Sequence, residues 1–349
     1  MPWVKSLLKG VFKLDQVVDS GSLRFIVIDG STIQERGATG TTYRLHIAID
    51  LISLSVCQVE VSTDKIGESL DHYTLVSGDV VLIDRGYNSP KSLVPFLDRG
   101  GEILLRYNAH GMNLFEENEA GRLVKINWEA RLQTLDKQAG CIDAYLCHGN
   151  KRIPVFLHAI PLPPEKAAEA RRKARQRSKK RQVDEKTLYL SEWVLVISSV
   201  PPALLGTQTV SALYRVRWQV ELVIKRLKSL LLVDELRAHK GTQLAELYLQ
   251  GKLLYVAITQ KVTQQRFSGV ARSMDKPRQL TDWRLWITVS GDFRAAVKAC
   301  FPRQERFKED CIKSLSERPR KRQLQGLPPA VLALMDTCQK LGVMGVSRV

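Results

Sequence analysis

The chain has 349 residues, 44% of them hydrophobic, which is enough to build one large or two smaller domain cores. Its 53 Lys and Arg against 36 Asp and Glu give a formal charge of +17, which predicts a polyanion partner, most simply DNA or RNA. Membrane-surface binding is the rival interpretation, but no lipid-anchor signal, no apolar run of ~18 residues and no secretory signal support it. The scattered cysteines indicate reduced thiols, so we expect a cytoplasmic protein without membrane contact.

The N-terminal quarter predicts a sheet with acids at strand ends. Residues 1–24 form a short lead, and the apolar run LRFIVIDGST then predicts a buried strand that ends at Asp29 and Gly30. YRLHIAIDL and LISLSVCQVEV alternate apolar and polar residues, which predicts two antiparallel neighbours of that strand. A helix is expected around 66–72. GDVVLIDRGYNSP then repeats the first pattern, with a short strand that ends at Asp84.

The middle of the chain changes character. Pro90 predicts the start of a helix and EILLRYNA a fifth strand, after which residues 108–190 carry the short strand patterns of a β-rich insertion. Its end, EKAAEARRKARQRSKKRQ, predicts a charged helix that either contacts phosphates or is simply solvated. The eight basic residues expected to contact DNA are Arg171, Arg172, Lys173, Arg175, Arg177, Lys179, Lys180 and Arg181.

The stretch YRVRWQVELVIKRLK, residues 214–228, contains no Gly or Pro and predicts one continuous helix. At ~100° per residue, Tyr214, Arg217, Glu221 and Lys228 share one stripe of that helix. The residues expected to face the core are Leu213, Val220, Ile224, Leu227 and Leu231, and those expected to face water are Arg215, Gln219, Arg226 and Ser229. Such a charged stripe is usually a solvated surface, but one acid flanked by cations also suits a metal ion and phosphates. The remainder of the chain is expected to be mostly helical and basic.

Three acids occur in a suggestive setting. Asp29 and Asp84 end two predicted central strands, and Glu221 lies on a predicted packed helix. Carboxylate oxygens are the ligands that Mg²⁺ prefers, and two such ions can support an in-line displacement at phosphorus. The rival acids Asp50, Asp64 and Asp79 rank lower; Asp50 also ends an apolar run, but no glycine turn follows it.

Taken together, VIDGST, LIDRGYN and the pattern Y-x2-R-x3-E-x6-K resemble the DDE transposases of bacterial insertion sequences, in the branch called family four, whose YREK signature is met by Tyr214, Arg217, Glu221 and Lys228. The resemblance runs from about Asp29 to about Gln260. It implies an α/β fold with a ribonuclease H-like mixed sheet and flanking helices, interrupted by a β-rich insertion and followed by a helical C-terminal region. The implied divisions are 1–24, 25–107 with 191–260, 108–190, and 261–349.

The resemblance also implies a chemistry. Asp29, Asp84 and Glu221 would be the catalytic, metal-binding triad, holding two Mg²⁺ ions that Mn²⁺ can replace. Tyr214, Arg217 and Lys228 would contact double-stranded DNA near the cleaved phosphate. The reaction would be hydrolysis of a phosphodiester at the element end, then attack of the freed 3′-hydroxyl on target DNA by a homodimer. In this branch an aromatic of the insertion can stack on a flipped base; Trp128 is either that residue or a core residue of the insertion.

One feature departs from the family pattern. Members usually carry an N-terminal DNA-binding domain before the first acid, whereas Asp29 comes almost at once here. We therefore expect this domain to be lacking. The alternatives are a catalytically inactive DNA-binding remnant and a nuclease with the same ribonuclease H-like core.

Overall fold

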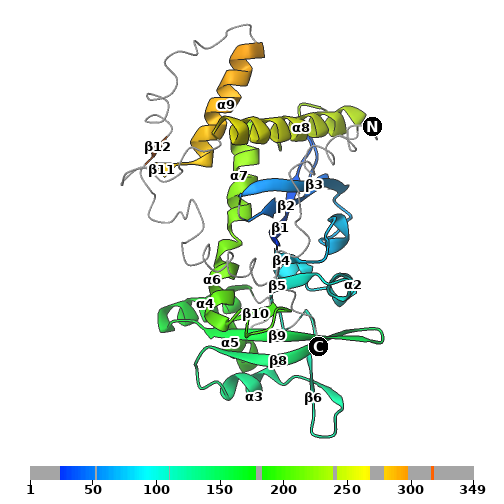
Figure 1. Cartoon of the computed structure of the whole chain (residues 1–349), viewed down its shortest axis with the longest axis vertical. Helices are drawn as coiled ribbons and strands as arrows, with labels where there is room; N and C mark the ends of the chain where they lie inside the picture. Colours follow the sequence, from blue (N-terminus) through cyan, green and yellow to red (C-terminus); the bar gives the residue numbers. More distant parts are fainter. Residues whose placement is uncertain are drawn as a thin grey trace. The chain divides into compact units, whose positions relative to one another are not determined.

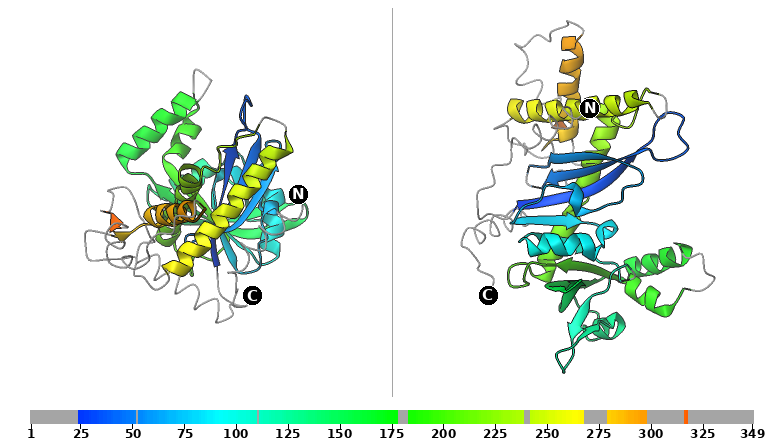
Figure 2. Two further views of the ribbon diagram at one scale, coloured as in Figure 1. Left: turned by 90° about the horizontal axis from the view of Figure 1, so that it is seen from above. Right: turned by 90° about the vertical axis from the view of Figure 1, so that its right-hand side faces the viewer.

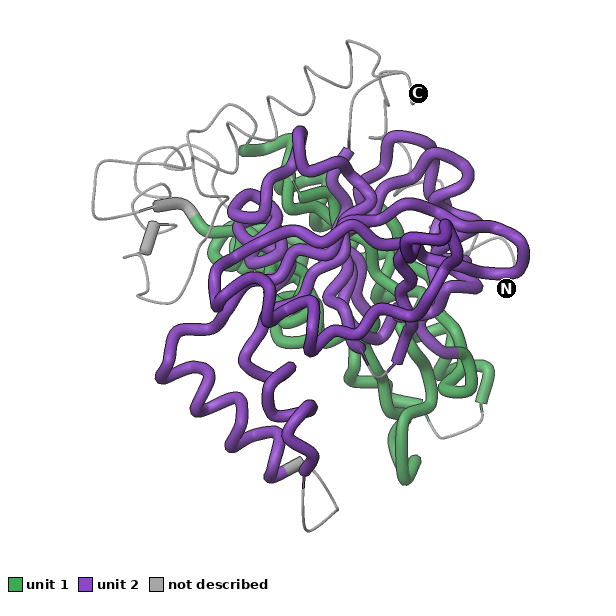
Figure 3. The backbone as a smooth tube through the Cα atoms, turned by 90° about the horizontal axis from the view of Figure 1, so that it is seen from below, with its two compact units in different colours: residues 1–17, 30–66, 219–328 green, residues 18–29, 67–218, 329–349 purple. Residues whose placement is uncertain are grey.

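The computed structural model describes residues 24–51, 53–109, 111–177, 183–238, 242–267, 279–297 and 316–317. Two compact units share the chain: unit 1 contains residues 30–66 and 219–328, and unit 2 contains residues 18–29 and 67–218 (Figure 3). Strand β1 (Arg24–Ile33) contributes its first part to unit 2 and its last part to unit 1. The predicted lead over residues 1–24 lies, but for Arg24, outside the described residues.

Unit 2 is built on three parallel strands. Strand β1 pairs in parallel with β4 (Asp79–Ile83), and β4 with β5 (Glu102–Arg106). Phe25 through Ile28 are 0% exposed, and all of β4 is buried. Continuous apolar runs of this kind belong to parallel strands that are covered on both faces, so both predicted strands are confirmed. Strand β4 ends just before Asp84 as expected, but β1 continues to Ile33, so the predicted end at Asp29 is wrong and this acid lies within the strand.

Antiparallel strands extend the sheet of unit 2 beyond β5. Their order is β5-β10-β9-β8-β6-β7, and Figure 1 shows the long β8–β9 ribbon and the β6–β7 hairpin. The bounds are Trp193–Ser198 for β10, Lys151–Pro161 for β9, Gly140–His148 for β8, Phe115–Glu117 for β6 and Leu123–Lys125 for β7. The strands expected within residues 108–190 therefore continue the same sheet through β10.

Helices and single turns complete the described part of unit 2. They are η1 (Leu70–His72), η2 (Arg85–Tyr87), α2 (Pro90–Asp98), α3 (Trp128–Gln133), α4 (Pro164–Arg177), α5 (Glu185–Ser191) and α6 (Thr207–Val216). As predicted, α2 begins at Pro90, whose fixed φ suits a first helical position. Helix α4 packs beside α5 (Figure 2).

The described part of unit 1 combines an antiparallel hairpin with three helices. Strand β2 (Tyr43–Asp50) pairs with β3 (Ser55–Thr63), in the order β3-β2-β1. The helices are α7 (Gln219–Leu231), α8 (Gln243–Arg266) and α9 (Asp282–Val297), and α8 contacts both α7 and α9 (Figure 1). The buried Gln260 amide of α8 accepts from the Val56 N–H at 2.7 Å and donates to the Val56 carbonyl at 2.9 Å, which fixes α8 on β3. The two-residue strands β11 (Gln279–Leu280) and β12 (Ser316–Glu317) pair with one another.

The predicted class, α/β with a mixed sheet flanked by helices, is confirmed, and the strand order fits the expected ribonuclease H-like core. In the part of the chain that the structure describes, no helix is long and apolar enough to cross a membrane.

The prediction of one continuous helix over residues 214–228 is wrong. Helix α6 ends at Val216, a turn occupies Arg217 and Trp218, and α7 begins at Gln219. At the break the Arg217 N–H bonds the Tyr214 carbonyl at 3.2 Å, a tighter i→i−3 bond than an α-helix uses.

Three smaller expectations also fail. Gln219 and Arg226, expected in water, are 3% and 8% exposed. Arg226 is buried because it pairs with Asp282 of α9 at 2.6 Å and lies over the Trp286 ring at 5.5 Å. The helix expected around 66–72 is only the single turn η1.

Trp128 lies in helix α3 of unit 2, where a strand pattern was expected. Its side chain is 3% exposed, donates from Nε1 to the Tyr107 hydroxyl at 3.1 Å, and meets that ring edge-on at 5.3 Å. Trp128 is therefore a core residue.

Candidate active site

Two of the predicted acids lie abreast in unit 2. The β1–β4 register pairs Arg24 with Asp79 and Val27 with Leu82, and the same offset sets Asp29 beside Asp84. Both side chains are half-buried. Residues abreast on neighbouring strands project from one face of a sheet, so the parallel pairing of β1 with β4 brings two carboxylates together.

The turn after β4 fixes the Asp84 carboxylate. Asp84 is the N-cap of η2, and its Oδ1 accepts from the Gly86 N–H at 2.6 Å. A Cβ at Gly86 would lie 1.8 Å from Glu68 Oε2 and 3.0 Å from Asp84 Oδ1, so a larger residue here would displace the Glu68 carboxylate. Glu68 is a third carboxylate at this edge of the sheet that sequence reasoning missed, because nothing in its neighbourhood marks it.

Two buried phenols, those of Tyr73 and Tyr87, lie beside the backbone of Asp29. The hydroxyls of Tyr73 and Tyr87 are 3.1 Å apart, and the Tyr73 hydroxyl donates to the Asp29 backbone carbonyl at 3.5 Å. Burial is the main cause that raises the pKa of both side chains above the ordinary tyrosine value. Both phenols therefore stay protonated and keep their bonds at neutral pH. Tyr87 belongs to the LIDRGYN motif, but its partner Tyr73 carries no sequence signal.

Helix α6 packs on β9 and β10 (Figure 1) and covers a row of residues that the strand registers align. This row contains Asp29, Asp84, Arg106, Val196 and His158. At the start of α6, Thr207 Oγ1 lies 3.0 Å from His158 Nδ1, and just past its end Arg217 Nη1 lies 3.5 Å from Asp29 Oδ2. The ten residues of α6 rise about 15 Å, and the row of five strands is about 19 Å wide. Because these lengths are similar and the two ends of α6 contact His158 and Asp29, the helix runs across the row from one end to the other.

Tyr214, one turn before Arg217, points toward the middle of this row. Its pKa is raised, mainly by burial and further by Asp84, while the cations Arg217 and Arg106 oppose the rise. The Tyr214 hydroxyl is also hydrogen-bonded to the Arg217 guanidinium. A neutral phenol and a guanidinium thus lie beside the Asp29–Asp84 pair, and both can donate hydrogen bonds to an anion.

The other two residues of the YREK pattern belong to unit 1. Glu221 is exposed in the first turn of α7. Lys228, two turns later, donates from Nζ to the Thr32 carbonyl of β1 at 2.9 Å. Lys228 therefore ties α7 to the last part of β1 within this unit.

The predicted basic helix corresponds to α4. Arg171 pairs with Glu192 at 2.6 Å and Lys173 with Glu169 at 2.8 Å. Arg172 and Arg175 are exposed and form no ion pair with any residue that the structure describes. Arg177 ends α4, whereas Lys179, Lys180 and Arg181 lie outside the described residues.

Two of the rival acids have local partners. Asp79 is 0% exposed and accepts from Arg24 Nε and Nη2 at 2.8 and 2.9 Å. Asp50 Oδ1 accepts from the Ser53 N–H at 2.8 Å, and Asp64 is exposed. Asp50 therefore holds its own turn, and Asp79 holds β1 to β4.

The donor chemistry at Asp29 and Asp84 fits a hard divalent cation, because both are carboxylates that face the same side of the sheet. Within the described ranges, no group of three or more His, Cys, Asp or Glu side chains is placed to hold a metal ion.

The sequence of the chain is similar to those of known transposases. A family profile described as "Transposase DDE domain" matches residues 20–256. Two proteins of Escherichia coli are each 29% identical over 259 residues, or 72% of this chain: the putative transposase InsL for insertion sequence element IS186A of strain K12, and the transposase for insertion sequence element IS421. The match covers 69% and 68% of their lengths. A cryo-EM structure of a piggyBac transposase synaptic complex with hairpin DNA aligns with a TM-score of 0.38 and 9% identity, over 85% of this chain and 58% of that one.

Proposed function

We propose that this chain, which belongs to the family of transposases with a DDE domain, cuts DNA at the ends of a mobile element and joins the freed 3′-hydroxyl to target DNA. Members of this family act on DNA in transposition and typically use a divalent metal ion. The observation that carries the proposal is the Asp29–Asp84 pair abreast on parallel strands, with Tyr214 and Arg217 beside it.

We propose Asp29, Asp84 and Glu221 as the catalytic residues and the ligands of two Mg²⁺ ions, which Mn²⁺ can replace. When bound, the metal supplies Lewis acidity and an activated oxygen nucleophile at the phosphodiester. The residues of the chain hold and orient the DNA strand. Arg217 and Tyr214 donate to phosphate oxygens next to the scissile bond, and the half-buried setting strengthens these bonds.

The branch called family four remains our proposal on the YREK pattern, with Lys228 as a further phosphate contact. The exposed Arg172 and Arg175 of α4 suit sequence-independent contact with the DNA backbone. We further propose residues 25–107 with 191–260 as the catalytic core, 108–190 as its insertion, and a homodimer that bridges two DNA ends in the bacterial cytoplasm.

A strand-cleavage assay tests this function. Purified protein is mixed with labelled duplex DNA that carries the ends of its own element, in Mg²⁺ or in EDTA. We expect cutting in Mg²⁺ only, and we expect Asp84→Asn to lower the rate by about 100-fold or more, because it removes a charged metal ligand. The matched control is Asp64→Asn, an exposed acid outside the site, which should cut like the wild type.

The other outcomes identify the alternatives. Salt-sensitive DNA binding without cutting in Mg²⁺ would indicate a DNA-binding remnant. Equal cutting of RNA or branched DNA would indicate a nuclease. Cutting that persists in EDTA, or that Asp84→Asn leaves intact, would refute the proposed site.

A further inference from the structure

Arg106 occupies a position in unit 2 that the family signature does not include. Arg106 is the last residue of β5, and Asp84 is the first residue after β4. The β4–β5 register pairs Ile83 with Leu105, so the next step sets Arg106 beside Asp84, in the row that begins with Asp29. A guanidinium therefore projects from the face of the sheet that carries the two carboxylates.

The surroundings of Arg106 are unusual for a half-buried cation. Long cationic side chains are seldom desolvated unless they are paired. In the described part of the chain Arg106 forms no ion pair with a carboxylate, and the groups that act on it are the Tyr214 phenol and the second cation Arg85. Burial, the largest cause, lowers the pKa of Arg106 from its ordinary value, and Arg85 lowers it further. The unfavourable desolvation of Arg106 would be relieved by an anion that reaches this edge.

We infer that Arg106 is a phosphate-binding residue of the strand-cleavage site, gripping a non-bridging oxygen of a DNA phosphate at or next to the scissile bond. This inference rests on the proposed function, because it gives the anion its identity. An arginine suits the task, since its planar fork can donate two parallel hydrogen bonds to one phosphate. The neutral Tyr214 hydroxyl and the exposed Arg85 complete a set of donors around that position.

The test is a cycle that pairs protein variants with chemically altered DNA. Single-turnover cleavage rates are measured for wild type, Arg106→Ala and Arg106→Lys on native duplex. The same rates are then measured on duplexes in which one phosphate near the cut is replaced by a neutral methylphosphonate. We expect Arg106→Ala to lose about 10- to 100-fold on native DNA, the range for a hydrogen bond to a charged group. The cleavage rate of Arg106→Lys should lie between those of the wild type and Arg106→Ala, because lysine keeps the charge but cannot donate two parallel hydrogen bonds.

The diagnostic result is non-additivity at one phosphate. When the gripped phosphate is neutral, wild type and Arg106→Ala should cleave at similar rates, whereas a neutral phosphate elsewhere should leave the Arg106→Ala loss unchanged. In titrations of uncut DNA, Arg106→Ala should also lower the salt slope by about one phosphate contact. A purely structural role for Arg106 would lower the rate equally on every duplex.

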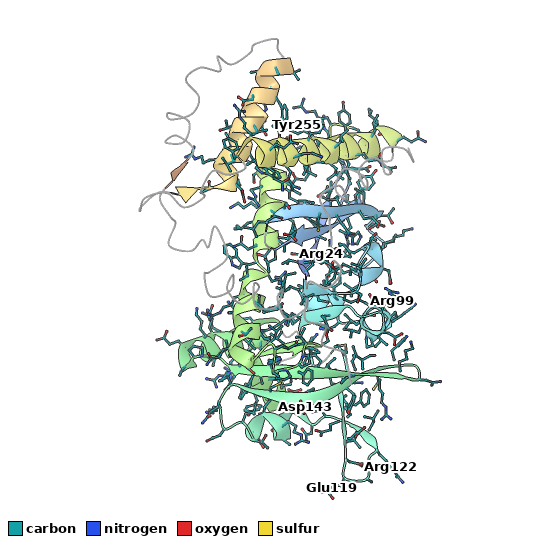
Figure 4. The ribbon with its side chains drawn as sticks, viewed as in Figure 1. Arg24, Arg99, Glu119, Arg122, Asp143 and Tyr255 are labelled. Carbon is teal, nitrogen blue, oxygen red and sulfur yellow. The ribbon has the colours of Figure 1, made fainter. Side chains whose placement is uncertain are left out.

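The matched control is Arg122→Ala, an exposed arginine at the tip of the β6–β7 hairpin in the same unit (Figure 4). It should cleave every duplex like the wild type. Circular dichroism checks the fold of each variant. If Arg106→Ala does not fold, the same rates are measured with Arg106→Lys and with Arg106→Gln, whose side chain fills more space than alanine. Wild-type rates for Arg106→Ala, or a loss that is the same on all duplexes, overturn the inference. Failure of the wild type to cut any duplex in Mg²⁺ or Mn²⁺ instead overturns the proposed function.

Discussion

Asp29 and Asp84, the paired acids of unit 2, are held in different ways. Asp84 accepts a backbone hydrogen bond from Gly86 at 2.6 Å, whereas Asp29 faces the Arg217 guanidinium at 3.5 Å. The Asp84 carboxylate is thus oriented by the turn of its own chain, and that of Asp29 by a side chain from the end of α6. Substitutions at Arg217 should therefore disturb Asp29 as well as the DNA contact.

A third acid in the same strands has only a structural task. Asp79 is fully buried, and both of its oxygens are bonded to Arg24, with the Val76 N–H as a further donor at 2.9 Å. Removing one partner leaves a buried charge without compensation. We expect Asp79→Ala to lower the free energy of unfolding by about 3–5 kcal/mol, measured by urea unfolding with tryptophan fluorescence.

The control for this prediction is Asp64→Ala, which removes an exposed acid and should change the free energy of unfolding by less than about 0.5 kcal/mol. If Asp79→Ala were as stable as that control, the Arg24–Asp79 pair would not hold β1 to β4.

At the scale of elements, α6 connects the sheet of unit 2 to the proposed chemistry. Its first residue, Thr207, meets the buried His158 of β9, and the residue just past its end, Arg217, meets Asp29. Burial lowers the pKa of His158 from 6.5 to about 4. This imidazole is therefore neutral at pH 7 in the folded state.

The His158 contact predicts a pH dependence. Between pH 6.5 and about 4 the unfolded chain binds a proton at His158 that the folded chain does not, so the free energy of unfolding falls as the pH falls. From pH 7 to pH 5 the contribution is about 2 kcal/mol. His158→Asn keeps a polar partner for Thr207 but cannot titrate, so its unfolding free energy should depend less on pH by this amount. Urea unfolding of both proteins at pH 5 and 7 measures the difference; equal slopes would contradict the buried neutral imidazole.

The break between α6 and α7 shows where sequence reasoning ends at this scale. Residues 214–228 are good helix formers, and no local signal marks the turn at Arg217 and Trp218. The burial of Arg226 depends in the same way on Asp282, more than fifty residues later. Both features follow from tertiary partners, which periodicity cannot supply.

At the scale of the whole molecule, the predictable part was the pattern repeated along the chain. Apolar runs followed by an acid predicted β1 and β4, although β1 continues past Asp29 to Ile33. Their burial on both faces is typical of the parallel strands that the structure shows. Register could not be predicted, because it depends on how distant strands align. For this reason the sequence predicted Asp29 and Asp84 as site residues but did not predict Arg106. The acids were found from their position in a motif, whereas Arg106 becomes a candidate only once the strands are aligned.

The net charge of +17 agrees with a DNA substrate but does not locate the chemistry, since it is spread over many exposed lysines and arginines. The proposed location of the chemistry rests on Asp29 and Asp84. The central claim is therefore that Asp29 and Asp84 act together as one site.

The most direct test is a comparison of single-turnover cleavage rates in Mg²⁺ for Asp29→Asn, Asp84→Asn and the double variant. Groups that act as a unit are strongly non-additive. If the two carboxylates share one task, each single variant should lose nearly all activity, and the double variant should be no slower than either. Rates that fall independently, so that the two losses multiply, or a single variant that cuts like the wild type, would contradict the account.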